Sequence, residues 1–225
     1  MIFQDMPENQ ARKLRLTSAS APMSDPAVDY PDWYMHRWHF LPEGYLSERS
    51  AAGYDRVIRN VYNVFNERRI ARALLRKVRT FAPESVLEVG PGPGRLLERL
   101  AGLRSVSRLT GVELSPYLLA RAAERLQGRQ VELVHGDGLA MPVPDGEFAL
   151  ATASHYLGHL PPGQRSRAVD ELARVVRPGG HVLIVDHRWH AWPKTPLLRK
   201  VESTTHAFGS IRMSVFERLH GGVGP

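Results

Sequence analysis

The 225-residue chain contains no cysteine. This absence excludes disulfide bonds, thiolate catalysis and zinc sites built on cysteine, but it says little about the cellular compartment. No apolar run approaches the ~18 residues of a membrane-spanning helix, so we expect no transmembrane segment. The N-terminus lacks the basic and apolar regions of a signal peptide, which makes a cytoplasmic location the default expectation.

Negative charge is also in short supply, since 23 acidic residues face 30 lysines and arginines and the formal net charge is +7. The excess favours an anionic partner, such as nucleic acid, an acidic membrane surface or an acidic small molecule, or else a solvated basic surface. The length suits one α/β domain with an extension, and 43% hydrophobic residues is a globular composition.

The stretch from Ser85 to Leu100 carries the strongest pattern in the chain. It opens with an apolar run typical of a buried strand, and from Arg95 it continues with leucines at helical spacing. Strand, loop and helix N-terminus together predict a nucleotide-type site at the carboxyl end of a parallel strand. A dinucleotide fingerprint would need its third glycine at position 95, which is arginine. Three alternate glycines allow a tight turn and close approach of a ligand: Gly90, Gly92 and Gly94.

Written as Glu88-x-Gly90-x-Gly92-x-Gly94, this stretch resembles the first motif of class I S-adenosylmethionine-dependent methyltransferases. The resemblance implies S-adenosyl-L-methionine as cofactor and a Rossmann-like α/β fold, a doubly wound, mostly parallel sheet with helices on both faces. The alternation of predicted strands and helices after residue 85 points to the same kind of sheet. Glu88 matches the acid of the motif, which in the family helps to hold the loop and the amino-acid end of the cofactor.

Two further acids follow predicted strands. Glu113 ends the next strand, about twenty residues past the glycine loop, where a carboxylate can accept both hydroxyl protons of a ribose. By the resemblance, Asp137 after the third strand receives the adenine amino group. We assign three more residues to the predicted cofactor site: Leu114, Gly138 and Ser154.

The segment after the predicted fourth strand, next to the expected methyl position, offers three candidates for catalysis: His155, Tyr156 and His159. His159 aligns with a histidine common in the family, and a role in the pocket wall is the alternative to catalysis. Histidine pairs at 155/159 and at 187/190 have spacings that suit a metal. No carboxylate cluster accompanies them in the sequence, so we expect no metal site.

The regions on either side of the motifs are less specific. Residues 1–28 are polar and predict a mobile arm, residues 29–80 predict an aromatic lid followed by helices, and residues 81–225 form the predicted catalytic domain. The aromatics between Tyr30 and Tyr45 suit either a lid over a pocket or ordinary core packing. A helix break is expected at 66–67. Beyond Asp186 we expect a helix over 196–206 and a strand over 211–219, which would shorten the C-terminal hairpin of the family.

These observations favour methyl transfer from S-adenosylmethionine to an oxygen or nitrogen of a small-molecule or lipid-like acceptor. The alternative is an RNA or protein methyltransferase, which rests on the basic charge alone, so a nucleic-acid partner is open but not favoured. A third interpretation is a non-catalytic cofactor-binding partner of another enzyme. The absence of cysteine argues against arsenite methylation. The sequence does not define the acceptor, and it leaves the oligomeric state open, a homodimer included.

Overall fold

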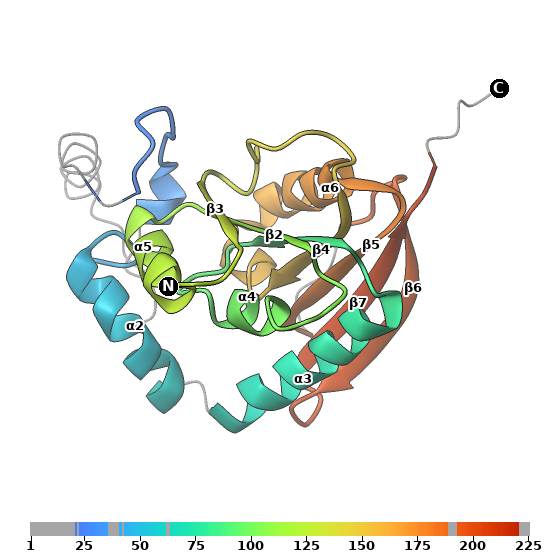
Figure 1. Cartoon of the computed structure of the whole chain (residues 1–225), viewed down its shortest axis with the longest axis horizontal. Helices are drawn as coiled ribbons and strands as arrows, with labels where there is room; N and C mark the ends of the chain where they lie inside the picture. Colours follow the sequence, from blue (N-terminus) through green and yellow to red (C-terminus); the bar gives the residue numbers. More distant parts are fainter. Residues whose placement is uncertain are drawn as a thin grey trace.

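The computed structural model describes residues 21–220 apart from positions 22, 36–40, 42, 62–63 and 189–192, and describes no side chain between 55 and 67. Its centre is a seven-stranded sheet in the order β3-β2-β1-β4-β5-β7-β6 (Figure 1). The strands are β1 (Ser85–Val89), β2 (Arg108–Glu113), β3 (Glu132–His135), β4 (Phe148–Ser154), β5 (Val176–His187), β6 (Leu198–His206) and β7 (Ile211–Arg218).

The first five strands are parallel to their neighbours, and β7 is antiparallel to both β5 and β6. Chain order reverses between β1 and β4, which lie side by side. In doubly wound sheets, ligands bind outside the carboxyl ends of the strands at such a switch point. The predicted Rossmann-like α/β fold is confirmed.

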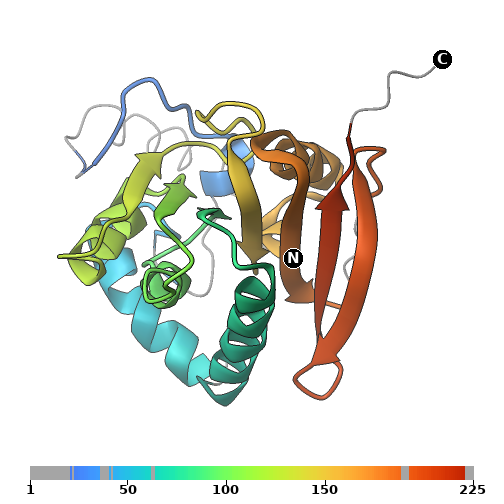
Figure 2. The same cartoon turned by 45° about the vertical axis from the view of Figure 1, so that its right-hand side comes forward.

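Helices cover both faces of the sheet (Figure 2). One core lies between the sheet and the side chains of α3, α4 and α5, and the other lies under α6. All five residues of β1 are buried, as expected for a central strand with a packed core on each side. The helices are α2 (Glu48–Val61), α3 (Val64–Phe81), α4 (Arg95–Leu100), α5 (Pro116–Arg125) and α6 (Arg165–Val175), with short 3-10 helices η1 (Asp32–Met35), η3 (Leu157–His159) and η4 (Pro162–Gln164).

The N-terminal aromatics pack on the carboxyl end of the sheet. Tyr30, Tyr34 and Tyr45 are buried in a third apolar cluster that includes Leu114 and Leu118, just after β2. Closer to the N-terminus, the backbone amide of residue 25 donates to His135 Nδ1 over 2.9 Å. The described part of the segment that we expect to be a mobile arm therefore contacts the sheet, and residues 1–20 lie outside the described residues.

Several expectations for individual elements are corrected. The break predicted at 66–67 is wrong, because α3 runs through these positions and α2 already ends at Val61. The helix predicted over 196–206 is also wrong, since this segment is the edge strand β6, whose side chains alternate between partly buried and exposed positions. The antiparallel hairpin is consequently not shortened, with nine residues in β6 and eight in β7. Within the described part of the chain, no helix combines the length and the apolar character needed to cross a membrane.

Candidate active site

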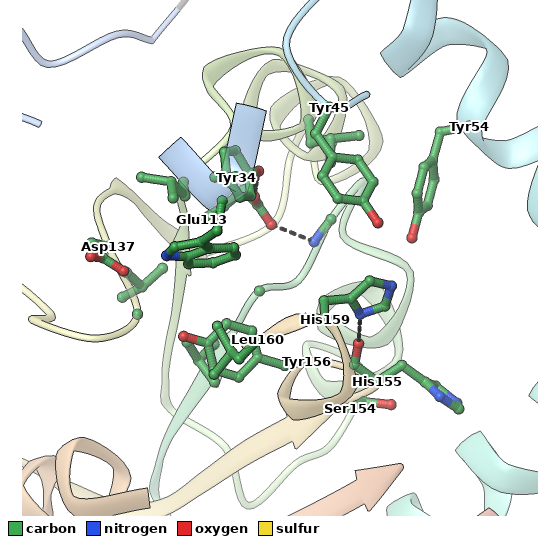
Figure 3. A pocket seen from close by; sticks show the side chains of 18 residues that line it. Tyr34, Tyr45, Tyr54, Glu113, Asp137, Ser154, His155, Tyr156, His159 and Leu160 are labelled. Carbon is green, nitrogen blue, oxygen red and sulfur yellow. Dashed lines mark hydrogen bonds between the residues drawn. The ribbon is translucent and has the colours of Figure 1, made fainter. Parts of the chain in front are cut away.

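A pocket with about 720 Å³ of free space, its open mouth included, lies at the carboxyl ends of β1, β2 and β4. The glycine loop, the end of β2, the segment after β4 and the N-terminal aromatics all contribute to its wall (Figure 3). All of the predicted site residues line this pocket except Glu88 and Gly94. Their roles toward a ligand remain predictions.

The backbone of the glycine loop is left-handed at all three glycines, with φ of 62° at Gly90, 55° at Gly92 and 76° at Gly94. A Cβ atom placed on Gly92 would have Tyr54 as its nearest neighbour, 3.9 Å away, so it would occupy free pocket space. A Cβ on Gly94 would instead lie 3.0 Å from the Cβ of Ala122 in α5. Gly92 therefore opens room for a ligand, whereas Gly94 lets α4 and α5 pack closely.

Glu113 is the most highly bonded acid of the pocket. Its Oε2 accepts the backbone N–H of Gly92, and its Oε1 accepts that of Ser115, both over 2.9 Å. The Tyr34 hydroxyl donates to Oε1 over 3.4 Å. Burial raises the pKa of Glu113, while the two amides act in the opposite direction. The carboxylate thus joins the glycine loop, the start of α5 and the N-terminal segment.

Glu88 is buried next to the loop and does not line the pocket. Burial, followed by the nearby Glu113 carboxylate, raises the pKa of Glu88 to about 8, and the Leu97 amide in the first turn of α4 opposes this rise. The Oε2 atom is buried and has no hydrogen-bond partner among the described residues. Glu88 is therefore placed to hold the loop and α4 from behind.

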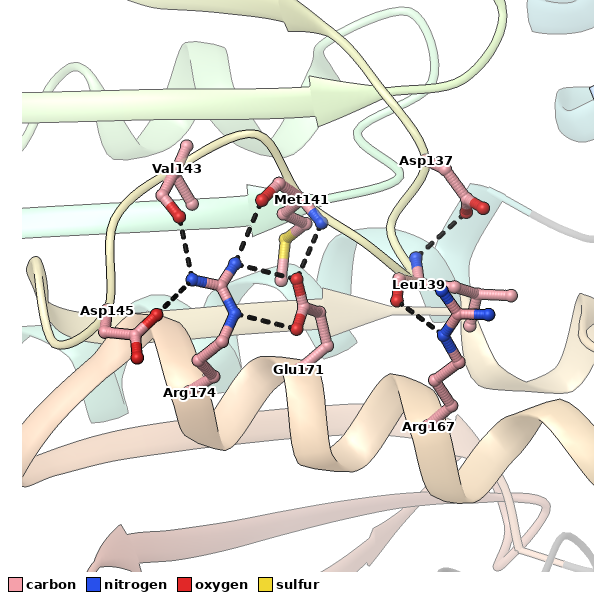
Figure 4. A network of polar contacts seen from close by, with 8 residues as sticks. All are labelled: Asp137, Leu139, Met141, Val143, Asp145, Arg167, Glu171 and Arg174. Atoms are coloured by element: carbon pink, nitrogen blue, oxygen red, sulfur yellow. Dashed lines mark hydrogen bonds and ion pairs between the residues drawn. The ribbon is translucent and has the colours of Figure 1, made fainter. Parts of the chain in front are cut away.

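The loop that carries Asp137 is held by α6 (Figure 4). Asp137 Oδ1 accepts the backbone N–H of Leu139 over 2.9 Å, and Arg167 Nε donates to the Leu139 carbonyl. Further along the loop, Arg174 donates to the Met141 carbonyl and also pairs with Glu171. Burial raises the pKa of Asp137. These contacts fix the position of the Asp137 carboxylate in the pocket wall.

The candidates after β4 point in different directions. His159 Nδ1 donates to the His155 carbonyl over 2.5 Å, so Nε2 is the nitrogen that can accept a proton. The His159 ring faces Tyr45 and Tyr54, whereas the His155 ring points away from that group (Figure 3). Burial keeps the pKa of Tyr156 well above its usual value, so its hydroxyl stays protonated.

The apolar part of the wall is what sequence reasoning missed: Val89, Val112, Leu118 and Leu160. Val89 and Val112 come directly before Gly90 and Glu113, and they lie at the ends of strands that the sequence does predict. That position is the only signal that could have identified them. Leu118 reaches the pocket from α5, and Leu160 reaches it from the position after η3. The apolar period alone does not distinguish such pocket-wall residues from core.

Comparison with known proteins agrees with this geometry. Residues 87–184 match the family described as "Methyltransferase domain". An uncharacterized methyltransferase of Geobacillus kaustophilus is 30% identical over 139 residues, which cover 62% of this chain and 60% of the relative. The demethylmenaquinone methyltransferase of Clavibacter sepedonicus is 30% identical over 156 residues, which cover 69% of this chain and 60% of the relative.

Among solved structures, the N-methyltransferase NodS of Bradyrhizobium japonicum WM9, in complex with S-adenosyl-L-homocysteine, superimposes with a TM-score of 0.64. It shares 23% identity, and the match covers 77% of this chain and 96% of NodS. At this identity the likeness concerns the fold.

The sheet order and the pocket at its switch point define a doubly wound α/β protein with a nucleotide-type site. Together with the glycine loop, the matched domain over residues 87–184 supports a class I S-adenosylmethionine-dependent methyltransferase. The match to the two curated relatives spans 60% of the length of each.

Proposed function

We propose that this chain binds S-adenosylmethionine in the pocket and transfers its methyl group to an oxygen or nitrogen of a small-molecule or lipid-like acceptor. When bound, the cofactor supplies a methyl group activated by the positive charge on sulfur. The observation that carries the proposal is the buried Glu113 carboxylate at the end of β2, next to the left-handed backbone of Gly92. The free space beside Gly92 leaves room for this cofactor. The carboxylate at the end of β2 is placed to bind its ribose.

Each acid then has a distinct task. Glu113 binds the two ribose hydroxyls, and its raised pKa does not prevent this because hydroxyl donors favour the charged form. Asp137, half-buried at the adjacent strand end, accepts a hydrogen bond from the adenine amino group. Glu88 does not line the pocket, so it acts by holding the glycine loop from behind, next to the amino-acid end of the cofactor.

On the acceptor side, His159 is the better placed base. Its Nδ1–H is tied to the backbone, which directs Nε2 to receive a proton from a hydroxyl or amine. The aromatic rings of Trp33, Tyr34 and Tyr45 exclude water and favour a cationic centre. Transfer then depends mainly on holding the two reacting atoms in line.

A small-molecule acceptor is supported by the way in which the N-terminal aromatics close over the pocket, and by similarity to a demethylmenaquinone methyltransferase. An RNA or protein acceptor is supported by net charge alone. A steep loss of acceptor binding with rising salt would favour nucleic acid, because phosphate contacts release counterions.

Calorimetry with S-adenosylhomocysteine tests the cofactor site. We expect binding by the wild-type protein, no binding of NAD, and a loss of about 1–3 kcal/mol of binding free energy in Glu113→Gln, as is typical for charge-assisted hydrogen bonds. Glu124→Gln is the control, because Glu124 is an exposed acid on α5. Wild-type affinity in Glu113→Gln would refute the ribose assignment.

A transfer assay separates catalysis from binding alone. The protein is incubated with tritiated S-adenosylmethionine and fractions of metabolites, lipids and RNA. We expect label in the metabolite or lipid fraction, and less of it with His159→Gln. Binding of the cofactor with no label in any fraction would support the non-catalytic alternative.

A further inference from the structure

Three side chains with metal-ligating atoms meet at the carboxyl ends of β4 and β5, beside the pocket. One nitrogen of His155, one nitrogen of His187 and one oxygen of Asp186 all lie within 4.8 Å of one another. The two imidazole rings are 5.8 Å apart between centroids, in an edge-on arrangement. His155 belongs to the pocket wall, so the cluster adjoins the proposed acceptor side.

The backbone directs His155 into this cluster. Its φ is +54°, a left-handed conformation that is uncommon outside glycine, and its N–H donates to the Val185 carbonyl over 2.7 Å. The bond ties the first residue after β4 to Val185, near the end of β5. The His155 ring contacts the His187 ring. It points away from Tyr45 and Tyr54 (Figure 3). Strained backbone of this kind is typical of functional sites.

Asp186 supplies the carboxylate. It is 1% exposed, its Oδ2 accepts the Gly158 N–H over 2.6 Å, and its Oδ1 accepts the N–H of His187 over 2.8 Å. A carboxylate oxygen carries two lone pairs, so an oxygen that accepts an N–H group can also bind a cation. These bonds hold the carboxylate still, in the way that ligands are oriented in natural metal sites.

We propose that His155, Asp186 and His187 bind a divalent first-row transition metal ion at the wall of the acceptor pocket. Two imidazoles and one carboxylate are a donor set that suits zinc, cobalt, manganese or iron(II), and suits magnesium and calcium poorly. A tetrahedral zinc site needs ligand atoms roughly 3.3 Å apart, so atoms that lie within 4.8 Å of one another need to approach by at most about 1.5 Å. A general base needs only one imidazole, and a second one facing the same carboxylate is what favours a metal.

This proposal departs from the expectation of no metal, and the reason is topological. The sequence pairs His155 with His159 and His187 with His190 by spacing. In the structure His159 instead donates to the His155 carbonyl, and His155 meets His187 across two parallel strands. His190 lies outside the described residues.

The role of the ion rests on the proposed methyl transfer. A hydroxyl of the acceptor would take an open coordination position, where the ion lowers its pKa and orients it toward the methyl group. The hydroxyl proton leaves to His159 or to water. A lone pair of the oxygen forms the new C–O bond, the C–S bond of the cofactor breaks, and its electron pair remains on sulfur. The acceptor class is therefore an alcohol or phenol rather than an amine.

The test is a direct metal titration of the full chain without a histidine tag. Cobalt(II) is followed by visible absorption, and zinc by competition with a chromophoric chelator. We expect one equivalent to bind, insensitive to magnesium, and at least about tenfold weaker binding in His187→Gln and in His155→Asn. Asparagine is used at 155 because it tolerates the left-handed backbone.

His181→Gln is the matched control, because His181 lies in the middle of the same strand β5, outside the proposed ligand set. It should leave the metal affinity unchanged. Calorimetry with S-adenosylhomocysteine on every variant shows whether the fold and the cofactor site persist. Cofactor binding without stoichiometric metal binding, or metal binding unchanged in both histidine variants, would overturn the metal site alone. Metal binding without cofactor binding would overturn the proposed function and leave the site standing.

Discussion

Two carboxylates, Glu88 and Glu113, are buried together behind and beside the glycine loop. Burial raises the pKa of both carboxyl groups, and the Glu113 carboxylate raises the pKa of Glu88 further. Glu113 compensates with two backbone amides, whereas one oxygen of Glu88 has no partner among the described residues. The glycine loop is therefore held by Glu88, a buried acid that lowers the stability of the fold. Such residues are common at functional sites.

Glu88 gives the protein a distinctive pH dependence. Because its pKa rises from 4.5 to about 8 on folding, the folded state retains the proton that the unfolded state releases. The free energy of unfolding should therefore fall as pH rises between these values, with a slope of up to about 1.4 kcal/mol per unit from this group. Urea titrations without cofactor across this range should show that Glu88→Gln flattens the curve. Equal slopes in both proteins would show that Glu88 ionises normally.

Gly138 is a residue whose missing side chain shapes the pocket. A Cβ there would lie 2.5 Å from both the Tyr156 hydroxyl oxygen and Val89 Cγ2. Gly138→Ala should cost about 1–3 kcal/mol of stability through overpacking and should weaken binding of S-adenosylhomocysteine. Gly163→Ala is the control, since a Cβ at that position has no atom within 4 Å, and it should change stability by less than about 0.5 kcal/mol. The prediction fails if the two variants unfold at the same denaturant concentration.

At the scale of elements, α5 connects the N-terminal segment to the cofactor site. Its N-cap Ser115 accepts the Leu118 N–H over 3.1 Å and donates to the Tyr45 carbonyl over 2.5 Å. One hydroxyl therefore starts the helix and also holds the aromatic segment against the pocket. The cap itself was predictable from Ser115-Pro116, but the bond to Tyr45 spans 70 residues and has no local pattern.

Ser115→Ala should remove both bonds. We expect a loss of about 1–2 kcal/mol of stability, at the upper end for a helix cap, together with weaker cofactor binding because Tyr34 and Tyr45 lose their anchor. Ser107→Ala removes an exposed hydroxyl bond to the Glu84 carbonyl and serves as the control. Chemical denaturation and calorimetry on both variants provide the measurements. A loss of stability with unchanged cofactor affinity would show that the Ser115 hydroxyl stabilises the fold but does not contribute to cofactor binding.

The elements that the sequence predicts are those with strong local patterns. Four elements have an apolar repeat that is bounded by a glycine, a helix-capping residue or a proline, and all four are found as expected: β1, β2, β4 and α5. The edge strand β6 was mistaken for a helix because it is exposed on one side and begins near Pro196-Leu197-Leu198, which suits a helix start. The pairing of His155 with Asp186 depends on strand order, which no local pattern contains.

At the scale of the whole molecule, the described N-terminal residues pack against the cofactor half of the protein, since Tyr30, Tyr34 and Tyr45 share one apolar cluster with Leu114 and Leu118. The division of the chain at residues 28 and 80 remains a prediction. Tyr34 reaches the acid proposed to bind the ribose, so the aromatic segment is coupled to the cofactor as well as to the acceptor.

Truncation tests this coupling. A chain without residues 1–20 should bind S-adenosylhomocysteine like the full chain, because their polar sequence predicts a mobile arm. A chain without residues 1–47 should bind at least about tenfold more weakly, or 1.4 kcal/mol, since Trp33, Tyr34 and Tyr45 leave the pocket. Both proteins are compared by calorimetry, with circular dichroism to verify folding. Full affinity in the shorter, folded chain would restrict the aromatic segment to acceptor binding.

The position of β7 between β5 and β6 also determines when the sheet can close during synthesis. Both neighbours leave the ribosome before the strand that separates them, so the edge of β5 near Val182 and Ile184 lacks its partner until residues 211–218 have been translated. A nascent chain that pauses before this point presents an open, apolar strand edge to other chains and to chaperones. Completion of the β5 edge thus comes after the whole cofactor half of the sheet has been synthesised.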